Sequence, residues 1–181
     1  EDNKGSLISW QEFGNWFYKL LNGKDNLHEQ SIKEINALIL PDDNVKQKIK
    51  KLYKYMQGRT RYVSVQLGIG GWQPFDAAYV HTKGYGDCKA LSNYMVTVLK
   101  AANITAYPVL INSGNDRYPM ITEFISNQFN HVIVCVPLKE DTVWLECTSQ
   151  NMPAGSIGWS NENRNALMIT PDGGVVVKTP V

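Results

Sequence analysis

The feature that most constrains the fold is a glycine-rich turn that runs directly into an amphipathic helix. Residues 84–90 read Gly-Tyr-Gly-Asp-Cys-Lys-Ala. Apolar side chains then recur at spacings of three and four, which predicts a helix with one buried face; they are Leu91, Tyr94, Met95, Val98, Leu99 and Ala102. Asn103 tolerates a left-handed backbone and is expected to end this helix. The pattern therefore places Cys88 in the first turn.

A cysteine in the first turn of a helix has two interpretations. The unpaired N–H groups and the positive end of the helix dipole favour the thiolate, which is the nucleophilic form. Alternatively, Cys88 is a small buried residue at a helix start. This stretch alone leaves both interpretations open.

Length and composition exclude several classes of protein. A chain of 181 residues with 43% hydrophobic and 19% charged residues is expected to bury one core. The net charge of +1 gives no reason to expect nucleic acid as a partner, and no apolar run is long enough for a membrane span. Because the chain begins at Glu1 without a methionine or a signal-like segment, we expect it to be excised from a longer protein. The three cysteines and three histidines lack the close spacing of a zinc site, so no metal or cofactor is expected.

The remaining pattern predicts helices first and strands afterwards. A capping box at Ser9 opens a helix that ends before Gly23, a short helix covers 31–38, and a third is capped by Asp42 or Asp43 and ends at Gly58. After the cysteine-bearing helix, strands are expected at 104–111, 129–136, 142–148 and in a hairpin of 166–170 with 175–178. A further short strand is expected at 60–65, and residues 75–83 are expected to be a connection. The polar loop 112–128 is long enough to be a cleft edge or a lid. The order predicts an α+β domain, with residues 1–42 as a helical lead-in and 43–181 as the core.

The two strands at 129–136 and 142–148 predict a hairpin with a definite register. With the turn near Lys139 and Glu140, facing residue numbers sum to 279, so Cys135 lies opposite Trp144. His131 and Glu146 then lie on one face as diagonal neighbours. Cys135 and Cys147 fall on opposite faces, which excludes a disulfide between them. A register shifted by one residue would place the two cysteines on one face and would separate His131 from Glu146.

His131 is the histidine best suited to activate Cys88. A neighbouring carboxylate orients an imidazole and fixes its tautomer, as a base for a cysteine requires. A strand histidine with a purely structural role is the alternative, but Glu146 between Leu145 and Cys147 would be costly to bury without a partner. His81 is a rival base without a carboxylate-bearing strand, and His28 is expected in a solvated loop.

These motifs together resemble the transglutaminase-like superfamily of papain-type cysteine enzymes. The resemblance rests on Gly-Asp-Cys at a helix start, His-Val-Ile opening a strand, and Trp-Leu-Glu-Cys-Thr in the next strand. It implies a papain/transglutaminase-like core in which the cysteine-bearing helix packs on an antiparallel sheet. It further implies that Cys88, His131 and Glu146 are a catalytic triad, with Glu146 standing where aspartate is usual.

The implied chemistry is acyl transfer from an amide to water or to an amine, on a peptide or protein substrate. Cys88 attacks, His131 moves the proton and Glu146 orients the ring. The oxyanion needs two donors: the Cys88 N–H is one candidate, and the Trp72 indole or the Gln73 amide is the other. These two residues follow a glycine-rich loop, 68–71, that could line the cleft, and Asp87 is a further cleft candidate. The alternative function is a degenerate member that binds peptide or glycan or serves as a scaffold.

A closer resemblance is to the transglutaminase-like domain of large bacterial envelope proteins. It covers roughly residues 45–180 and adds the motifs Thr-Arg-Tyr at 60–62, Gly-Trp-Gln-Pro at 71–74 and Phe-Asn-His at 129–131. It implies flanking β-rich domains in the parent chain and a location in the cell envelope, in the periplasm.

Overall fold

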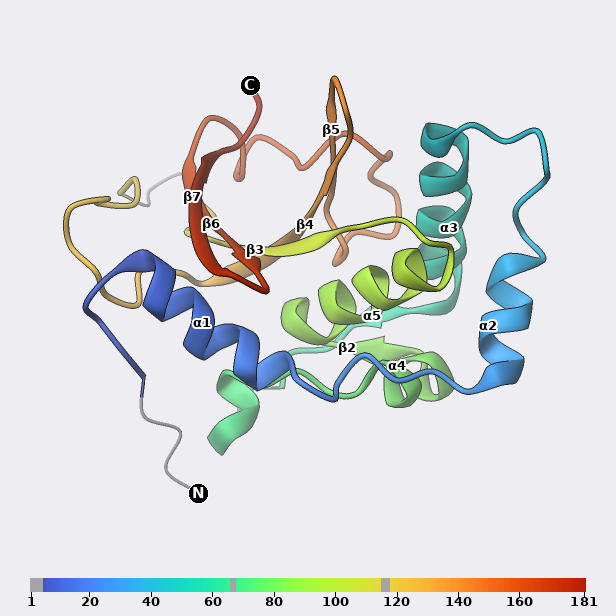
Figure 1. Cartoon of the computed structure of the whole chain (residues 1–181), viewed down its shortest axis with the longest axis horizontal. Coiled ribbons are helices and arrows are strands. Elements are labelled where there is room, and N and C mark those ends of the chain that lie inside the picture. The colour runs from blue at the N-terminus through green and yellow to red at the C-terminus, as the bar shows by residue number, and fades with distance from the viewer. Residues whose placement is uncertain (1–4, 66–67, 115–117) are drawn as a thin grey trace.

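The chain folds into helices packed against one antiparallel sheet, in a computed structural model that describes residues 5–65, 68–114 and 118–181 (Figure 1). The predicted α+β class is confirmed. The helices are α1 (Trp10–Leu21), α2 (Glu29–Asn36), α3 (Val45–Arg59), α4 (Ala77–Lys83) and α5 (Cys88–Ala101), with a 3-10 turn, η1 (Gly68–Gly71). The strands are β1 (Arg61–Tyr62), β2 (Tyr85–Gly86), β3 (Tyr107–Ile111), β4 (His131–Pro137), β5 (Thr142–Leu145), β6 (Asn165–Thr170) and β7 (Gly173–Lys178).

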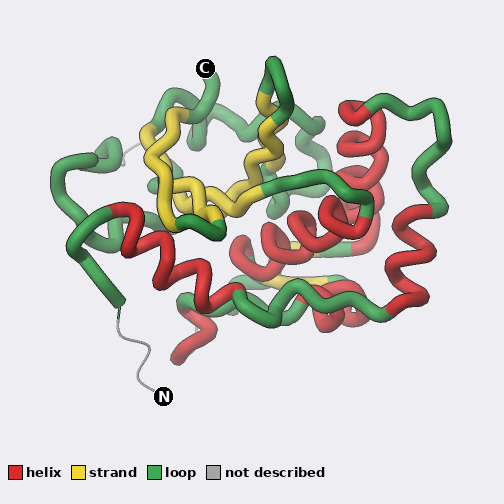
Figure 2. The backbone as a smooth tube through the Cα atoms, viewed as in Figure 1, coloured by secondary structure: helices red, strands yellow, loops and turns green. Residues whose placement is uncertain are grey.

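The main sheet has the strand order β5-β4-β3-β6-β7, and every neighbouring pair is antiparallel. The tube view shows this curved sheet on one side of the molecule and the helices gathered on the other (Figure 2). α5 packs chiefly on β4, whereas α1 packs on β6 and β7. The two ends of the sheet are therefore covered by different helices.

The central helix starts where the sequence predicts. Asp87 is its N-cap, and the Asp87 side chain accepts a hydrogen bond of 3.0 Å from the Ala90 N–H, which satisfies one of the unpaired donors of the first turn. The left-handed conformation predicted for Asn103 is confirmed by a φ of 58°. α5 contributes most of its residues to a core shared with α3, α4, β4 and β5.

Three local predictions were wrong. α3 is capped by Asn44, whose side chain and that of Gln47 exchange hydrogen bonds with each other's backbone. Asp43 instead accepts from the Leu40 N–H and pairs with Lys51. The connection 75–83 contains α4, which is too short to display a helical period. The strand expected at 60–65 shrinks to β1, which pairs with β2 in parallel.

α1 covers the sheet with an aromatic stripe. Its N-cap Ser9 accepts from the Glu12 N–H at 3.1 Å, which is one half of the predicted capping box; the Glu12 carboxylate instead accepts from the Ser6 hydroxyl. The buried side chains on its inner face are Trp10, Phe13, Phe17 and Leu20. Gly14 lies so close to β7 that a Cβ added there would be 1.9 Å from the Gly174 nitrogen. Helix and strand therefore approach each other with no room for a side chain at this point.

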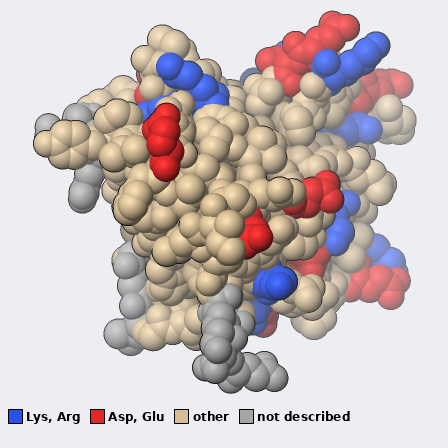
Figure 3. Space-filling model, turned by 60° about the vertical axis from the view of Figure 1, so that its left-hand side comes forward, with Lys and Arg blue, Asp and Glu red and all other residues tan. Residues whose placement is uncertain are grey.

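The predicted loop 112–128 lies against α1, although its residues 115–117 fall outside the described part of the chain. The Trp10 indole N–H donates to the Thr122 carbonyl at 2.7 Å. Met120 and Ile125 from the described part of this segment, and Phe129 directly after it, join the aromatic cluster of α1. The side of the molecule on the left in Figure 1, which carries α1 and this loop, shows few charged side chains (Figure 3). Over the residues described, helices long and apolar enough for a bilayer span are absent.

Candidate active site

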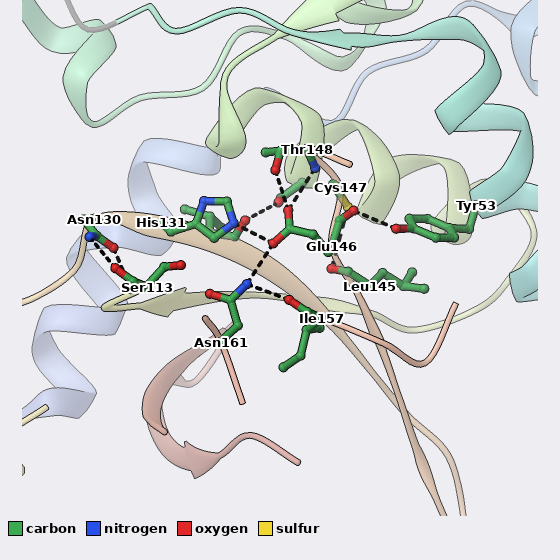
Figure 4. Close-up of polar contacts among 12 residues, drawn as sticks. Tyr53, Ser113, Asn130, His131, Leu145, Glu146, Cys147, Thr148, Ile157 and Asn161 are labelled. Atoms are coloured by element: carbon green, nitrogen blue, oxygen red, sulfur yellow. Dashed lines mark hydrogen bonds and ion pairs between the residues drawn. The ribbon is translucent and has the colours of Figure 1, made fainter. Parts of the chain in front are cut away.

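The structure brings Cys88, His131 and Glu146 together from three elements. Cys88 is the first residue of α5, His131 is the first residue of β4, and Glu146 follows the last residue of β5. Cys88 and His131 lie together in the wall of one pocket, and the Cys88 side chain acts to raise the pKa of His131. His131 Nε2 lies 2.8 Å from Glu146 Oε2 (Figure 4). His131 thus interacts both with Cys88 and with Glu146.

The predicted hairpin register is confirmed. Val134 pairs with Leu145 and Cys135 with Trp144, so facing numbers sum to 279 as expected. Cys135 joins the core on one face of the sheet, and Cys147 joins the core on the other face beneath α5. All three cysteines are free thiols.

Glu146 is a buried carboxylate whose two oxygens both accept two hydrogen bonds. Oε1 accepts from the Thr148 N–H at 3.0 Å and the Thr148 hydroxyl at 2.6 Å. Oε2 accepts from the Asn161 amide at 3.0 Å in addition to His131. Burial raises the pKa of Glu146, but the donors from His131 and Thr148 outweigh it, and the pKa falls below its usual value. Glu146 is therefore charged at neutral pH.

His131 is held as an imidazolium. Burial lowers its pKa, but the interactions with Cys88 and Glu146 outweigh burial and raise the pKa to about 10. The charged form of the ring is therefore favoured at neutral pH. Burial raises the pKa of Cys135 to about 11. Burial, together with the nearby Glu146 charge, raises the pKa of Cys147 well above its ordinary value.

Cys88 opens into a small pocket with aromatic walls. The pocket has a volume of about 290 Å³, and its lining includes Phe17 of α1, Trp72 after η1, and Phe129 and Asn130 before β4. Lys89 also lines it, but its ammonium pairs with the Asp87 carboxylate, and both side chains are buried. The pocket wall is thus largely uncharged apart from the catalytic candidates.

Of the other predicted site residues, Trp72 lines the pocket beside Cys88, whereas the Gln73 and Asp87 side chains make contacts elsewhere. Trp72 lies in the pocket wall beside Cys88, packed edge-on against Trp16. The Gln73 amide instead donates to the Leu20 carbonyl at 3.3 Å, and within the described part of the chain Gln73 is not among the residues that line this pocket. Asp87 is a helix cap and the partner of Lys89. Its carboxylate is therefore engaged beneath the cleft wall.

His81, the rival base, lies in a different environment. Its Nδ1 is 2.8 Å from the Tyr94 hydroxyl, and Arg59 donates to its backbone carbonyl at 2.9 Å. Burial and the Arg59 charge lower the pKa of His81, so the ring stays neutral inside the helical core. His28 is exposed at the start of α2.

Several residues around Cys88, His131 and Glu146 could not be recognised as their neighbours from the sequence. The buried Ser92 hydroxyl donates to the Val132 carbonyl at 3.1 Å, which joins α5 to β4 one turn after Cys88. The Tyr53 hydroxyl donates to the Glu146 carbonyl at 2.6 Å. A hydroxyl on the buried face of α5 was a usable signal for Ser92. Asn161 lies in a segment without periodicity, which gives no such signal.

The described residues do not form a metal-binding site. Among the residues described, no group of three or more histidines, cysteines and carboxylates is placed to hold an ion. Apart from Glu146, the polar groups around His131 are hydroxyls and amides. They come from residues such as Ser113, Asn130 and Ser160, which line a neighbouring cavity of about 440 Å³.

Comparison with known proteins finds similarity in structure rather than in sequence. No family model matches the chain, and no curated protein matches it. A "putative protease" from Parabacteroides distasonis superimposes with a TM-score of 0.67 at 13% identity, over 92% of this chain and 31% of that one. A "putative cysteine protease" from Cytophaga hutchinsonii superimposes with a TM-score of 0.51 at 12% identity, over 90% of this chain and 46% of that one. The chain thus shares a fold with parts of two larger proteins and spans less than half of each.

Proposed function

We propose that this chain is a cysteine-dependent acyl-transfer enzyme of papain/transglutaminase-like fold that acts on amide bonds of peptides or proteins. Cys88 is the nucleophile, His131 the acid and base, and Glu146 the group that orients the ring. The observation that carries the proposal is the placement of a helix-start cysteine in one pocket with His131, whose ring is hydrogen-bonded to a charged, buried Glu146. The fold shared with the two structures named as proteases supports it.

The first half-reaction forms a thioester. The Cys88 sulfur attacks the amide carbonyl carbon, and the C=O electron pair moves onto oxygen. When the tetrahedral intermediate collapses, the C–N bond breaks and the His131 imidazolium gives its proton to the departing amine. Glu146 keeps the ring aligned through Nε2 while the proton leaves from the side that faces Cys88.

The second half-reaction passes the acyl group to water or to an amine. Neutral His131 takes a proton from the acceptor as it attacks the thioester carbon. Collapse of this second intermediate breaks the C–S bond, and the released thiolate lies again beside the imidazolium. Water as acceptor gives a peptidase or amidase, and an amine gives a cross-link.

The oxyanion is assigned to the Cys88 backbone N–H and the Trp72 indole. Cys88 is the first residue of α5, where backbone N–H groups lack an intrahelical partner. Trp72 lines the same pocket, whereas the Gln73 amide faces Leu20. Asp87 contributes indirectly, because it caps the helix that presents Cys88.

The pocket walls favour an uncharged, apolar group on the acyl side of the scissile bond. Phe17, Trp72 and Phe129 offer aromatic surface, and the charge of Lys89 is already compensated. A charged substrate group would be desolvated there without a partner, which is costly. We therefore propose a peptide segment with an apolar or aromatic side chain as the acyl donor.

The proposal is tested by asking which cysteine becomes acylated. A p-nitrophenyl ester of an N-acetylated aromatic amino acid is added at pH 7.5, and the labelled peptide is identified by mass spectrometry. We expect rapid labelling at Cys88, no labelling in Cys88→Ser, and unchanged labelling in the matched control Cys135→Ser. Equal labelling of the three cysteines would overturn the proposal.

The fate of the thioester distinguishes the functions within the class. Release of free acid indicates a hydrolase, and transfer to an added alkylamine indicates cross-linking. A parent protein that binds peptides while Cys88 stays unlabelled would be the degenerate binding module. We retain the prediction that the domain is part of a bacterial envelope protein with flanking β-rich domains.

A further inference from the structure

Asn161 is a buried amide in the irregular segment between β5 and β6, and it contacts the proposed triad directly. Its side chain donates from one nitrogen, Nδ2, to Glu146 Oε2 at 3.0 Å and to the Ile157 carbonyl at 2.8 Å. Only 2% of the residue is exposed. We propose that Asn161 is a positioning residue that fixes the Glu146 carboxylate in the place from which it meets His131. The inference deepens the proposed function and rests on it.

The orientation of the Asn161 amide is determined by its neighbours. Both groups at Nδ2, a carboxylate oxygen and a backbone carbonyl, are acceptors, so turning the amide over would place oxygen against oxygen. Within the described part of the chain, the buried Asn161 Oδ1 has no hydrogen-bond partner. The amide therefore serves as a donor, at the cost of an unpaired acceptor.

Each oxygen of Glu146 accepts two hydrogen bonds, and Asn161 supplies one of the two at Oε2. Thr148 supplies both donors of Oε1, and His131 and Asn161 share Oε2 (Figure 4). Without Asn161, Thr148 would hold one oxygen while the other could rotate away from the ring. A glutamate has one more rotatable bond than an aspartate, so this second anchor has particular value at position 146.

The backbone holds Asn161 independently of Glu146. The Asn161 N–H donates to the Gly158 carbonyl at 2.9 Å, and its carbonyl accepts from the Thr179 hydroxyl at 2.7 Å. Thr179 follows β7 and also accepts from the Arg164 N–H at 2.9 Å. The segment is thus fixed to the far end of the sheet, and Asn161 is presented to Glu146 by a rigid frame.

The neutrality of Asn161 is also part of the inference. The titratable groups that act on Glu146 or lie beside it are His131 on β4, Tyr53 on α3 and Cys147 next in the chain. A lysine or arginine at 161 would compete with the imidazolium for the carboxylate. An amide stabilises the carboxylate without replacing its ion pair with His131.

The test compares Asn161→Leu with a matched control, Asn93→Leu. Asn93 is likewise buried and donates from Nδ2 to the backbone carbonyls of Lys24 and Phe75, neither of which is a carboxylate. Two quantities are measured. The first is the midpoint of the acidic limb of the pH–rate profile, which is the pH at which the rate of Cys88 acylation falls to half on the acidic side. The second is the pH midpoint of the Glu146 carboxyl titration, followed by carbon NMR on glutamate-labelled protein. We expect Asn161→Leu to move both to higher pH by about one unit, and Asn93→Leu to lower the melting temperature with neither shift.

A second variant keeps the test decisive if Asn161→Leu does not fold. Asn161→Asp preserves the shape but replaces the donor by an acceptor, so the acidic limb should move further than in the leucine variant. A variant that folds and melts lower, with the Glu146 titration unchanged, would overturn the positioning role. The NMR titration needs no substrate, so it tests Asn161 even where the parent protein fails to acylate; that failure would refute the proposed function instead.

Discussion

Glu146 is one methylene longer than the aspartate that the resemblance implies at this position, and the structure gives the extra length a use. The longer side chain reaches His131, Thr148 and Asn161 at once. Buried carboxylates are stable only when their lone pairs are satisfied, and here four donors satisfy them. The glutamate is thus accommodated by its surroundings.

Glu146→Gln should lower the rate of Cys88 acylation at least about tenfold. The substitution removes the negative charge that helps raise the pKa of His131 to about 10. The imidazolium would then lose its proton at lower pH, and the alkaline limb of the acylation rate should move downward. Single-turnover acylation across pH 6–11 measures both effects.

Glu146→Asp is the control, because it keeps the charge and shortens the reach. It should acylate more slowly than the parent, since the shorter side chain gives up part of the hydrogen-bond set, but faster than the glutamine variant. A glutamine variant with the parent rate and the parent alkaline limb would remove Glu146 from the triad and leave a Cys–His dyad.

Among the packed elements, α1 and β7 approach each other backbone to backbone at three glycines, which are Gly14, Gly173 and Gly174. The added Cβ of Gly14→Ala would meet backbone atoms of Gly173 and Gly174, which cannot turn aside as a side chain can. The helix must therefore move away from the sheet. We expect a loss of about 1–3 kcal/mol in the free energy of unfolding, measured by urea denaturation.

Gly58→Ala provides a matched control in another helix. A Cβ at Gly58 in α3 meets nothing within 4 Å, so only the helical propensity changes. The same substitution should stabilise the protein there by about 0.5–1 kcal/mol. Similar losses at both positions would contradict the close packing of α1 on β7.

The elements also show what the sequence could and could not predict. The hairpin register followed from alternation and one turn, so the meeting of His131 with Glu146 was predictable. α4 and the Asn44 cap were missed, because seven residues display no period and three polar residues in a row offer equivalent caps. Asn161 could not be found, because its place depends on a loop fixed by Thr179. Long-range hydrogen bonds of this kind leave no local pattern.

For the molecule as a whole, His131 and Glu146 of the proposed triad should make the free energy of unfolding fall at both acidic and alkaline pH. The pKa of His131 is raised to about 10 in the folded protein, above its ordinary value of 6.5. Its contribution is therefore complete below pH 6.5 and is lost as the pH rises through 10. The pKa of Glu146 is lowered from 4.5, so its contribution is present above pH 4.5 and is lost as the pH falls through the lowered value.

The free energy of unfolding should thus be greatest between about pH 4.5 and 6.5. Urea denaturation at fixed temperature across pH 3–11 measures the profile. His131→Gln should flatten the decline between pH 6.5 and 10, because the titrating group is gone. An equally steep decline in that variant would assign the effect to other groups.

The attachment of α1 to the cleft has a consequence for how the protein can be divided. Phe17 forms part of the wall beside Cys88, and Trp10 holds the Thr122 region of the segment that leads into His131. A fragment starting at residue 43 would contain Cys88, His131 and Glu146 and still lack one side of the pocket. We expect Cys88 of such a fragment to undergo the proposed acylation only when the first 42 residues are added back as a separate peptide. Residues 1–42 therefore complete the pocket of residues 43–181 in the way that a separate subunit completes a shared site.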